Sequence, residues 1–308
     1  MQKIRLALLA GGKSGEREVS LQGAAEVEKA LNPEKYEVKR YDPATDLPAL
    51  IRDAERIDVA FILLHGRWGE DGTVQGFLEL LEIPYQGADV LGSAMAMDKH
   101  VAKLMYRNAG LQVADWVMAT MADCANPERI IEELGLPVVV KPIRQGSSLG
   151  MSIPRNREDL ISGLRQAFNY DREVMVEKFI KGREITVGII GNDELTALPL
   201  VEIIPGANYQ FFNYEAKYQP GASREVCPAE LDQTIAAQAQ EWGIRAHRAL
   251  KLRGYSRTDM IVSGDDLYVL ETNTIPGMTP TSLLPQAAAA FGLSFGALLD
   301  RLIELAMA

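Results

Sequence analysis

Residues 255–273 read Tyr-Ser-Arg-Thr-Asp-Met-Ile-Val-Ser-Gly-Asp-Asp-Leu-Tyr-Val-Leu-Glu-Thr-Asn, and this stretch predicts a β-hairpin. Segments rich in Ile, Val, Leu and Tyr flank a turn of Ser-Gly-Asp-Asp. Side chains two apart in a strand share a face, so Arg257 joins Asp259, and Glu271 joins Asn273. Carboxylate and amide oxygens are ligands that Mg²⁺ prefers, so one face of the hairpin is a candidate magnesium site.

The length of the hairpin loop decides whether the two carboxylates meet. A two-residue loop at Gly264-Asp265 would place Asp259 and Glu271 on opposite faces, whereas a loop of odd length would set them directly across from one another. A metal site shared by Asp259 and Glu271 therefore predicts a loop with an odd number of residues. The alternative is a solvated hairpin face that carries ordinary charges.

The first third of the chain alternates strand and helix patterns. Apolar strands are predicted at 4–10 and 58–64, and a helix at 19–31. This order favours parallel βαβ units with a ligand crevice at the carboxyl ends of the strands. Gly11-Gly12-Lys13-Ser14 is not a phosphate-binding P-loop, because Ala7 stands where that pattern requires glycine.

Two polar loops follow predicted strands in this region. Glu16 either pairs with the ammonium group of a substrate or serves only as a carboxylate at a helix start, where the helix dipole favours it. His65-Gly-Arg-Trp-Gly-Glu-Asp-Gly72 follows a buried strand, a place where α/β proteins bind ligands. For His65 alone, a structural role is at least as well supported as a catalytic one.

The middle of the chain carries a phosphate-binding pattern. A strand that ends in Lys141 runs into the loop Gly146-Ser-Ser-Leu-Gly150, from which a return strand is predicted at 149–153. Backbone amides of such loops wrap phosphates, and a nearby strand lysine strengthens this interpretation. Residues 206–224 show no clear period, which is typical of a lid over an active site.

Composition excludes several functional classes. A net charge of −10 over 308 residues, with no basic run, disfavours nucleic-acid binding. Cys124 and Cys227 lack metal-ligand spacing and are interpreted as packing residues. The apolar run at the start is too short for a signal peptide, and no stretch approaches the length of a membrane helix. We therefore expect a cytoplasmic protein without membrane partners.

Seven motifs run in register from the first strand to the last helix: Glu16-Arg-Glu-Val-Ser20, His65-Gly-x-x-Gly-Glu-Asp-Gly72, Met97-Asp-Lys99, Val140-Lys-Pro142, Gly146-Ser-Ser-Leu-Gly150, Tyr214-Glu-Ala-Lys-Tyr218 and Glu271-Thr-Asn-Thr-Ile-Pro-Gly-Met-Thr279. Together they resemble the D-alanine:D-alanine ligases of the ATP-grasp superfamily. The resemblance implies a mixed α/β ATP-grasp fold. It implies an N-terminal Rossmann-like parallel-sheet domain (1–94), a central subdomain (95–183) and a C-terminal subdomain (184–308) that holds the metal site and the lid at 206–224.

The resemblance also assigns roles to individual residues. The residues expected to bind ATP are Lys99, Lys141, Ser148, Glu177, Lys178, Ile180, Glu184 and Lys217. Those expected to hold two Mg²⁺ ions, with Mn²⁺ as a possible replacement, are Asp259, Glu271 and Asn273. Those expected to orient D-alanine or support the reaction are Glu16, His65, Ser147, Tyr218, Arg257, Gly277, Ser282 and Leu283. The family is commonly dimeric, so a homodimer is expected.

The implied reaction joins two D-alanines through a D-alanyl phosphate, with ATP as phosphoryl donor, for peptidoglycan precursors. One alternative keeps the fold and changes the acceptor to D-lactate or D-serine. Another is a non-catalytic ATP-binding scaffold, which the retained metal carboxylates and phosphate lysines disfavour. A generic NTPase is disfavoured by the broken P-loop pattern.

Overall fold

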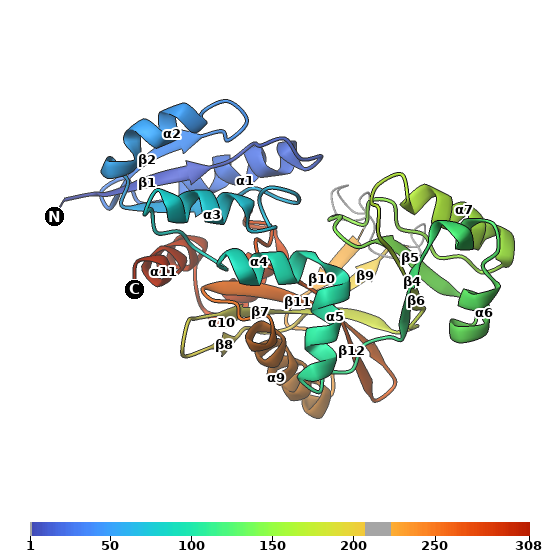
Figure 1. The fold of residues 1–308 in the computed structure, drawn as a ribbon. Coiled ribbons are helices and arrows are strands. Elements are labelled where there is room, and N and C mark those ends of the chain that lie inside the picture. Colours follow the sequence, from blue (N-terminus) through green and yellow to red (C-terminus); the bar gives the residue numbers. More distant parts are fainter. Residues whose placement is uncertain (1, 207–222) are drawn as a thin grey trace.

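The N-terminal sheet is parallel, as predicted. This computed structural model describes residues 2–206 and 223–308 (Figure 1). The sheet has the order β2-β1-β3 and consists of β1 (Ile4–Leu9), β2 (Tyr36–Tyr41) and β3 (Val59–Ile62). The helical segments of this region are α1 (Arg17–Ala30), α2 (Leu47–Asp53), η1 (Ala54–Arg56) and α3 (Thr73–Leu80). The carboxyl ends of β1 and β3 lead directly into the loops that carry Glu16 and His65.

The middle of the chain folds into a separate antiparallel sheet. It has the order β4-β6-β5 and consists of β4 (Trp116–Ala119), β5 (Val138–Pro142) and β6 (Val174–Lys178). It is accompanied by η2 (Met121–Cys124), α6 (Glu128–Leu134) and α7 (Arg157–Ala167). The predicted return strand at 149–153 is wrong in extent, because only Ser152 pairs with Val140 in an isolated bridge. A further hydrogen bond from the Val138 amide to the Pro154 carbonyl holds the segment after the polar loop against β5.

The C-terminal sheet is the largest and lies at the centre of the molecule (Figure 1). Its strands are β7 (Arg183–Ile190), β8 (Thr196–Ala197), β9 (Val201–Pro205), β10 (Ser223–Val226), β11 (Tyr255–Ser263) and β12 (Asp266–Asn273). The remaining helices of the described residues are α4 (Val90–Met97), α5 (Lys99–Asn108), α9 (Gln233–Ala249), α10 (Leu283–Phe291) and α11 (Phe295–Met307). The predicted lid falls mostly at 207–222, outside the described residues, although β10 begins within its range.

The β11–β12 hairpin corrects the prediction about its loop. Ser263 pairs with Asp266, so the loop has two residues rather than an odd number. Asp259 nevertheless pairs directly with Glu271, because the register shifts after Asp259 and leaves Leu270 as an extra residue in β12. A β-bulge of this kind inserts one residue into one strand and re-aims its side chains. The extra residue that sets Asp259 across from Glu271 therefore lies in strand β12 and not in the hairpin loop.

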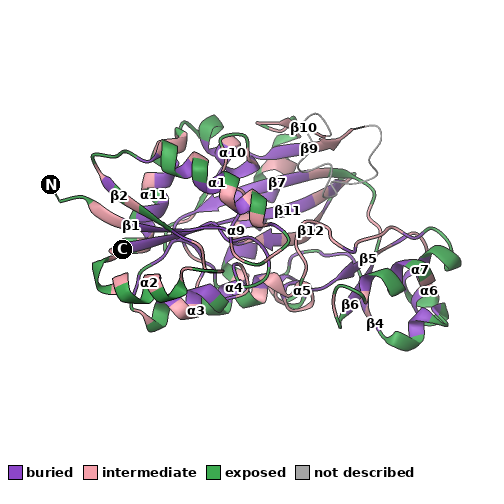
Figure 2. Cartoon of the chain, turned by 90° about the horizontal axis from the view of Figure 1, so that it is seen from above, coloured by how far each residue is buried: buried purple, intermediate pink, exposed green. Residues whose placement is uncertain are grey.

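One hydrophobic core joins the N-terminal sheet to the C-terminal sheet. Phe61 of β3, Leu284 of α10 and Leu302 of α11 belong to the same buried cluster. Figure 2 shows the buried strands inside and the exposed helix faces outside. Helix α5 packs elsewhere, against β12 and α9. Shared apolar burial resists relative movement of the elements involved, so this core holds the Glu16 and His65 loops beside the hairpin. The division of the chain at 94 and 183 stays a prediction.

In the described part of the chain, no single helix has the length and apolar character to cross a membrane. The pair α10 and α11 meets the criteria of length and composition only when taken together, and the two helices are bent by 101°.

Candidate functional site: two adjoining cavities

The first cavity lies between the antiparallel β5–β6 region and the β11–β12 hairpin. Its volume is about 150 Å³. It brings together all the described residues expected to bind ATP and both carboxylates expected to hold a metal: Lys99, Lys141, Ser148, Glu177, Lys178, Ile180, Glu184, Asp259 and Glu271. Lys217, also expected to bind ATP, lies outside the described residues.

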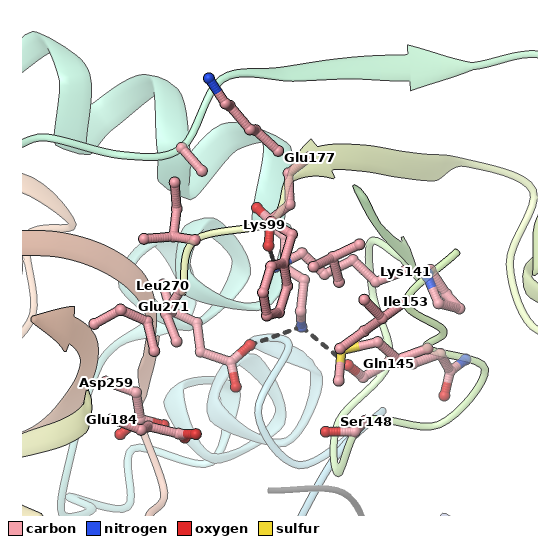
Figure 3. A pocket seen from close by; sticks show the side chains of 18 of the residues that line it. Lys99, Lys141, Gln145, Ser148, Ile153, Glu177, Glu184, Asp259, Leu270 and Glu271 are labelled. Carbon is pink, nitrogen blue, oxygen red and sulfur yellow. Dashed lines mark hydrogen bonds and ion pairs between the residues drawn. The ribbon is translucent and has the colours of Figure 1, made fainter. Parts of the chain in front are cut away.

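Lys99 connects the two sides of the first cavity. It is the first residue of α5, and Asp98 caps this helix by accepting hydrogen bonds from the His100 and Val101 amides, as its type predicts. The Lys99 ammonium lies 3.1 Å from Glu271 and donates to the Gln145 carbonyl at 3.0 Å (Figure 3). A cation between the β11–β12 hairpin and the glycine loop is well placed to contact a phosphate.

The sequence interpretation missed the apolar walls of this cavity. They are formed by Val139, Met151, Ile153, Phe179, Ile261 and Leu270. Leu270 is the bulged residue, and it lines the same cavity as its neighbour Glu271. Adjacent strand residues normally point to opposite faces, so the regular alternation of β12 could not reveal this contact. An apolar slot of this kind suits a planar aromatic base.

Glu177 faces two buried lysines rather than open space. Its Oε1 lies 2.5 Å from the Lys141 ammonium, and its Oε2 lies 2.7 Å from the Lys103 ammonium. Burial alone would raise the pKa of Glu177, but the charges of Lys103 and Lys141 outweigh it and lower the pKa to about 2. Glu177 is therefore an ionised structural partner of Lys141, and its backbone rather than its carboxylate is suited to contact a base.

The hairpin carboxylates suit a hard divalent cation. Asp259 accepts two hydrogen bonds from Arg257, each of 2.8 Å, and one of 2.6 Å from Thr186. The Asn273 amide nitrogen donates to Asp259 at 3.1 Å. Residues 2–206 and 223–308 contain no group of three or more His, Cys, Asp or Glu side chains arranged to bind a metal. Two carboxylates and an amide fit Mg²⁺, which takes most of its remaining ligands from water and phosphate.

The second cavity lies between α1, the His65 loop and the segment that follows β12. Its volume is about 280 Å³. It brings together all the described residues expected to orient D-alanine or support the reaction: Glu16, His65, Ser147, Arg257, Gly277, Ser282 and Leu283. Asn273 lines this cavity as well. Tyr218 lies outside the described residues.

Glu16 joins the N-terminal region to the glycine loop. Its carboxylate is buried and accepts a hydrogen bond from the Ser147 hydroxyl. A Cβ atom at either Gly66 or Gly146 would lie 2.9 Å from a Glu16 oxygen, closer than real Cβ atoms come. Glycine therefore lets both loops approach this carboxylate. No cap hydrogen bond from Glu16 to α1 is formed, which favours a ligand-binding role over that of a helix cap.

Glu70 was given no role by the sequence interpretation, although it lies in the His65 loop. It accepts hydrogen bonds from the Gly66 amide at 2.7 Å and the Ile275 amide at 3.3 Å, so it ties this loop to the segment after β12. Burial, reinforced by Glu16, raises the pKa of Glu70 to about 8. Burial also lowers the pKa of His65, against the opposing charge of Glu16. Only the fold brings these three groups together.

The raised pKa of Glu70 predicts a pH-dependent stability. Between the ordinary glutamate pKa and about 8, the folded protein binds a proton at Glu70 that the unfolded chain has lost. Stability should therefore fall as pH rises across this range. Glu70→Gln, which mimics the protonated form, should reduce this slope in chemical denaturation measured between pH 5 and pH 9. The exposed Glu82→Gln variant should keep the wild-type slope, and an unchanged slope in Glu70→Gln would contradict the assignment.

Ser282 and Leu283 form the start of α10 at the far side of the second cavity. The Ser282 hydroxyl accepts from the Thr279 amide at 3.1 Å and lies 2.8 Å from the Thr279 hydroxyl, so it does not cap the helix. The start of α10 therefore lines the cavity without a side-chain cap. Helix N-termini bind carboxylates through such amides and the helix dipole.

A small third cavity of about 30 Å³ shares its lining with both larger ones. It shares Lys99 and Glu271 with the first cavity, and Glu70, Gly146 and Asn273 with the second. The hairpin end is thus the place where a group could pass from one cavity to the other.

Comparisons with known proteins agree with this geometry. The family models described as D-ala D-ala ligase N-terminus and C-terminus match residues 44–88 and 105–304. The D-alanine–D-alanine ligase of Syntrophobacter fumaroxidans is 59% identical over 99% of this chain and 98% of the relative. The D-alanine–D-alanine ligase of Desulfotalea psychrophila is 60% identical over 99% of this chain and 96% of the relative.

Solved structures show the same fold. The D-alanine–D-alanine ligase of Bacillus anthracis complexed with ATP superimposes with a TM-score of 0.86 at 37% identity, over 99% of this chain and 97% of that one. The VanG D-Ala:D-Ser ligase of Enterococcus faecalis superimposes with a TM-score of 0.85 at 32% identity, over 99% of this chain and 100% of that one. The fold is therefore of the ATP-grasp type, and the chain belongs to the D-alanine:D-alanine ligase family.

Proposed function

We propose that this protein joins two molecules of D-alanine into D-alanyl-D-alanine and converts ATP to ADP and phosphate. The observation that carries the proposal is the pair of cavities that meet at the end of the β11–β12 hairpin. The first offers lysines and an apolar slot for ATP, and the second offers Glu16, Arg257 and a helix N-terminus for amino acids. The full-length relatives named D-alanine–D-alanine ligase support the same activity.

In the first step, a carboxylate oxygen of the donor D-alanine attacks the γ-phosphorus of ATP. The bond from phosphorus to the β–γ bridging oxygen breaks, and ADP leaves with that electron pair, so the donor becomes a D-alanyl phosphate. Lys99 and Lys141 would hold the phosphates, while Glu16 would orient the ammonium group of the donor. Two Mg²⁺ ions held by Asp259, Glu271 and Asn273 would neutralise charge on the phosphoryl group.

In the second step, the free amine of the acceptor attacks the acyl carbon. The carbon–oxygen bond to phosphate then breaks, phosphate leaves, and the amine loses its extra proton. Arg257 and the Gly277 amide both line the second cavity, where they would stabilise the oxyanion. Ser282 and the Leu283 amide would bind the carboxylate of the acceptor.

The remaining site assignments belong to the same proposal. Lys178, Ile180 and the Glu177 backbone would hold the adenine, Glu184 would contact the ribose, and Ser148 would contact phosphate from the glycine loop. His65, buried and with a lowered pKa, would act near the reacting carboxyl group as a neutral imidazole. Lys217 and Tyr218 keep their expected roles in phosphate contact and donor binding.

The cellular role follows from the product. D-alanyl-D-alanine is a component of peptidoglycan precursors, so we propose that the protein acts in the cytoplasm, where ATP and free amino acids are supplied. A homodimer is part of the same proposal.

Competition among acceptors tests the proposal. The protein is incubated with Mg²⁺, ATP, D-alanine and an equal concentration of D-lactate or D-serine, and the products are identified by mass spectrometry. We expect D-alanyl-D-alanine to dominate in both mixtures at neutral pH. A depsipeptide as the main product would identify D-lactate as the preferred acceptor, and D-alanyl-D-serine would identify D-serine. ATP binding without any product would favour a non-catalytic scaffold.

A further inference from the structure

Lys103 is buried beneath the first cavity and does not line it. It lies one turn after Lys99 in α5 and is 1% exposed. Its ammonium donates to the Ala114 carbonyl at 3.0 Å and lies 2.7 Å from Glu177 Oε2. It also lies 5.1 Å from the centre of the Trp116 ring. A lysine is almost never buried to this degree unless it is paired, so its contacts require an explanation.

The charges that line the first cavity suggest why a lysine is buried beneath it. Among the described residues, the lining side chains comprise the three lysines Lys99, Lys141 and Lys178 and four carboxylates. Lys99 is paired with Glu271, and Lys141 is paired with Glu177. Lys99 and Lys141 are therefore each matched by a carboxylate, although the proposed ligand is a polyanion.

Lys103 changes this balance through Glu177. Each oxygen of the Glu177 carboxylate contacts a different lysine, so Lys103, Glu177 and Lys141 together carry a net charge of +1. Burial lowers the pKa of Lys103 although Glu177 opposes this shift, while the charges of Lys103 and Lys141 lower the pKa of Glu177 to about 2. An ionised carboxylate at 2.7 Å favours the charged form of Lys103 over the neutral one.

We propose that Lys103 is a positioning residue for ATP that binds Glu177 and thereby leaves the charge of Lys141 available to the phosphates. This inference rests on the proposed function, because it assumes that the first cavity binds ATP. Without Lys103, Glu177 would neutralise Lys141, and the buried pair would present no net charge to a phosphate. The adenine slot, formed by apolar side chains, would be unaffected.

The test compares the binding of ATP and adenosine by calorimetry. Lys103→Met should weaken ATP binding by about 10- to 100-fold, the size expected for one charge at several ångströms in a partly buried site. Adenosine binding should change by less than about 3-fold, since adenosine carries no phosphate. Arg107→Met is the matched control, because Arg107 lies on the same helix, stacks on the same Trp116 ring at 4.3 Å and pairs with Asp115 rather than Glu177.

A double variant separates charge from packing. Lys103→Met combined with Glu177→Gln leaves Lys141 as the one charge of the cluster and should recover ATP affinity to within a few-fold of wild type. It also removes both members of a buried ion pair, which proteins tolerate better than the loss of one, so it remains informative even where Lys103→Met fails to fold.

Three results would overturn the inference: unchanged ATP affinity in Lys103→Met, equal losses for ATP and adenosine, or no recovery in the double variant. Wild-type protein that binds no ATP would instead refute the proposed function, and this is measured before any variant.

Discussion

Replacing Glu271 with glutamine should lower kcat by about 10³-fold, while ATP affinity changes by only a few-fold. Glu271 lies directly across from Asp259 and 3.1 Å from the Lys99 ammonium, at the junction of the two larger cavities. Glutamine keeps the size of the side chain and removes its charge. The loss should therefore fall on phosphoryl transfer, where charge must be neutralised, rather than on the adenine contacts.

Steady-state kinetics and calorimetry on the same preparations separate these effects. Asp266→Asn is the matched control, because Asp266 is an exposed carboxylate on the same hairpin and should leave kcat unchanged. Wild-type turnover in Glu271→Gln would contradict the assignment of Glu271 as a metal ligand. An equal loss of activity in Asp266→Asn would indicate a general effect on the hairpin.

Glu16→Gln should have the second largest effect, on the donor amino acid. Glu16 is buried in the second cavity and accepts a hydrogen bond from the Ser147 hydroxyl. A glutamine can keep that hydrogen bond but carries no charge for an ammonium group. We expect kcat/KM for D-alanine to fall by about 10²-fold, mainly through a higher KM for the donor, with ATP affinity unchanged.

The control for this variant is Glu18→Gln, which alters an exposed carboxylate in the first turn of the same helix. Initial rates over a range of D-alanine concentrations distinguish donor from acceptor saturation. A donor KM in Glu16→Gln equal to that of wild type would restrict Glu16 to a structural role between the two loops.

The βαβ order and the shared face of the hairpin could be predicted because they rest on local patterns, whereas most residues of the two cavities were expected only from the resemblance to a known family. Period-two alternation placed Arg257 with Asp259, and the strand ends placed Glu16 and His65 at one edge of a parallel sheet. The bulge at Leu270 could not be predicted in this way. A strand shows no local signal for an extra residue when that residue is itself apolar, and the register is set by pairing with β11.

Glu70 and Lys103 escaped prediction for a different reason. Their roles depend on partners far away in the sequence: Ile275 for Glu70, and Glu177 for Lys103. A charged residue in a loop or on a helix is usually solvated, so the sequence alone favours a surface position. Only the packing of α5 shows that Lys103 is withdrawn from solvent, and only the folded loops show that the Gly66 and Ile275 amides hold Glu70.

The central claim is that a carboxylate oxygen of D-alanine becomes bonded to the γ-phosphorus of ATP in this site. The most direct test supplies D-alanine labelled with ¹⁸O in its carboxyl group, together with Mg²⁺ and ATP, and measures the released phosphate by mass spectrometry. The account predicts one ¹⁸O atom in phosphate for each D-alanyl-D-alanine formed, because that oxygen leaves with phosphorus when the amide forms. Dipeptide accompanied by unlabelled phosphate, or by label in AMP, would contradict it.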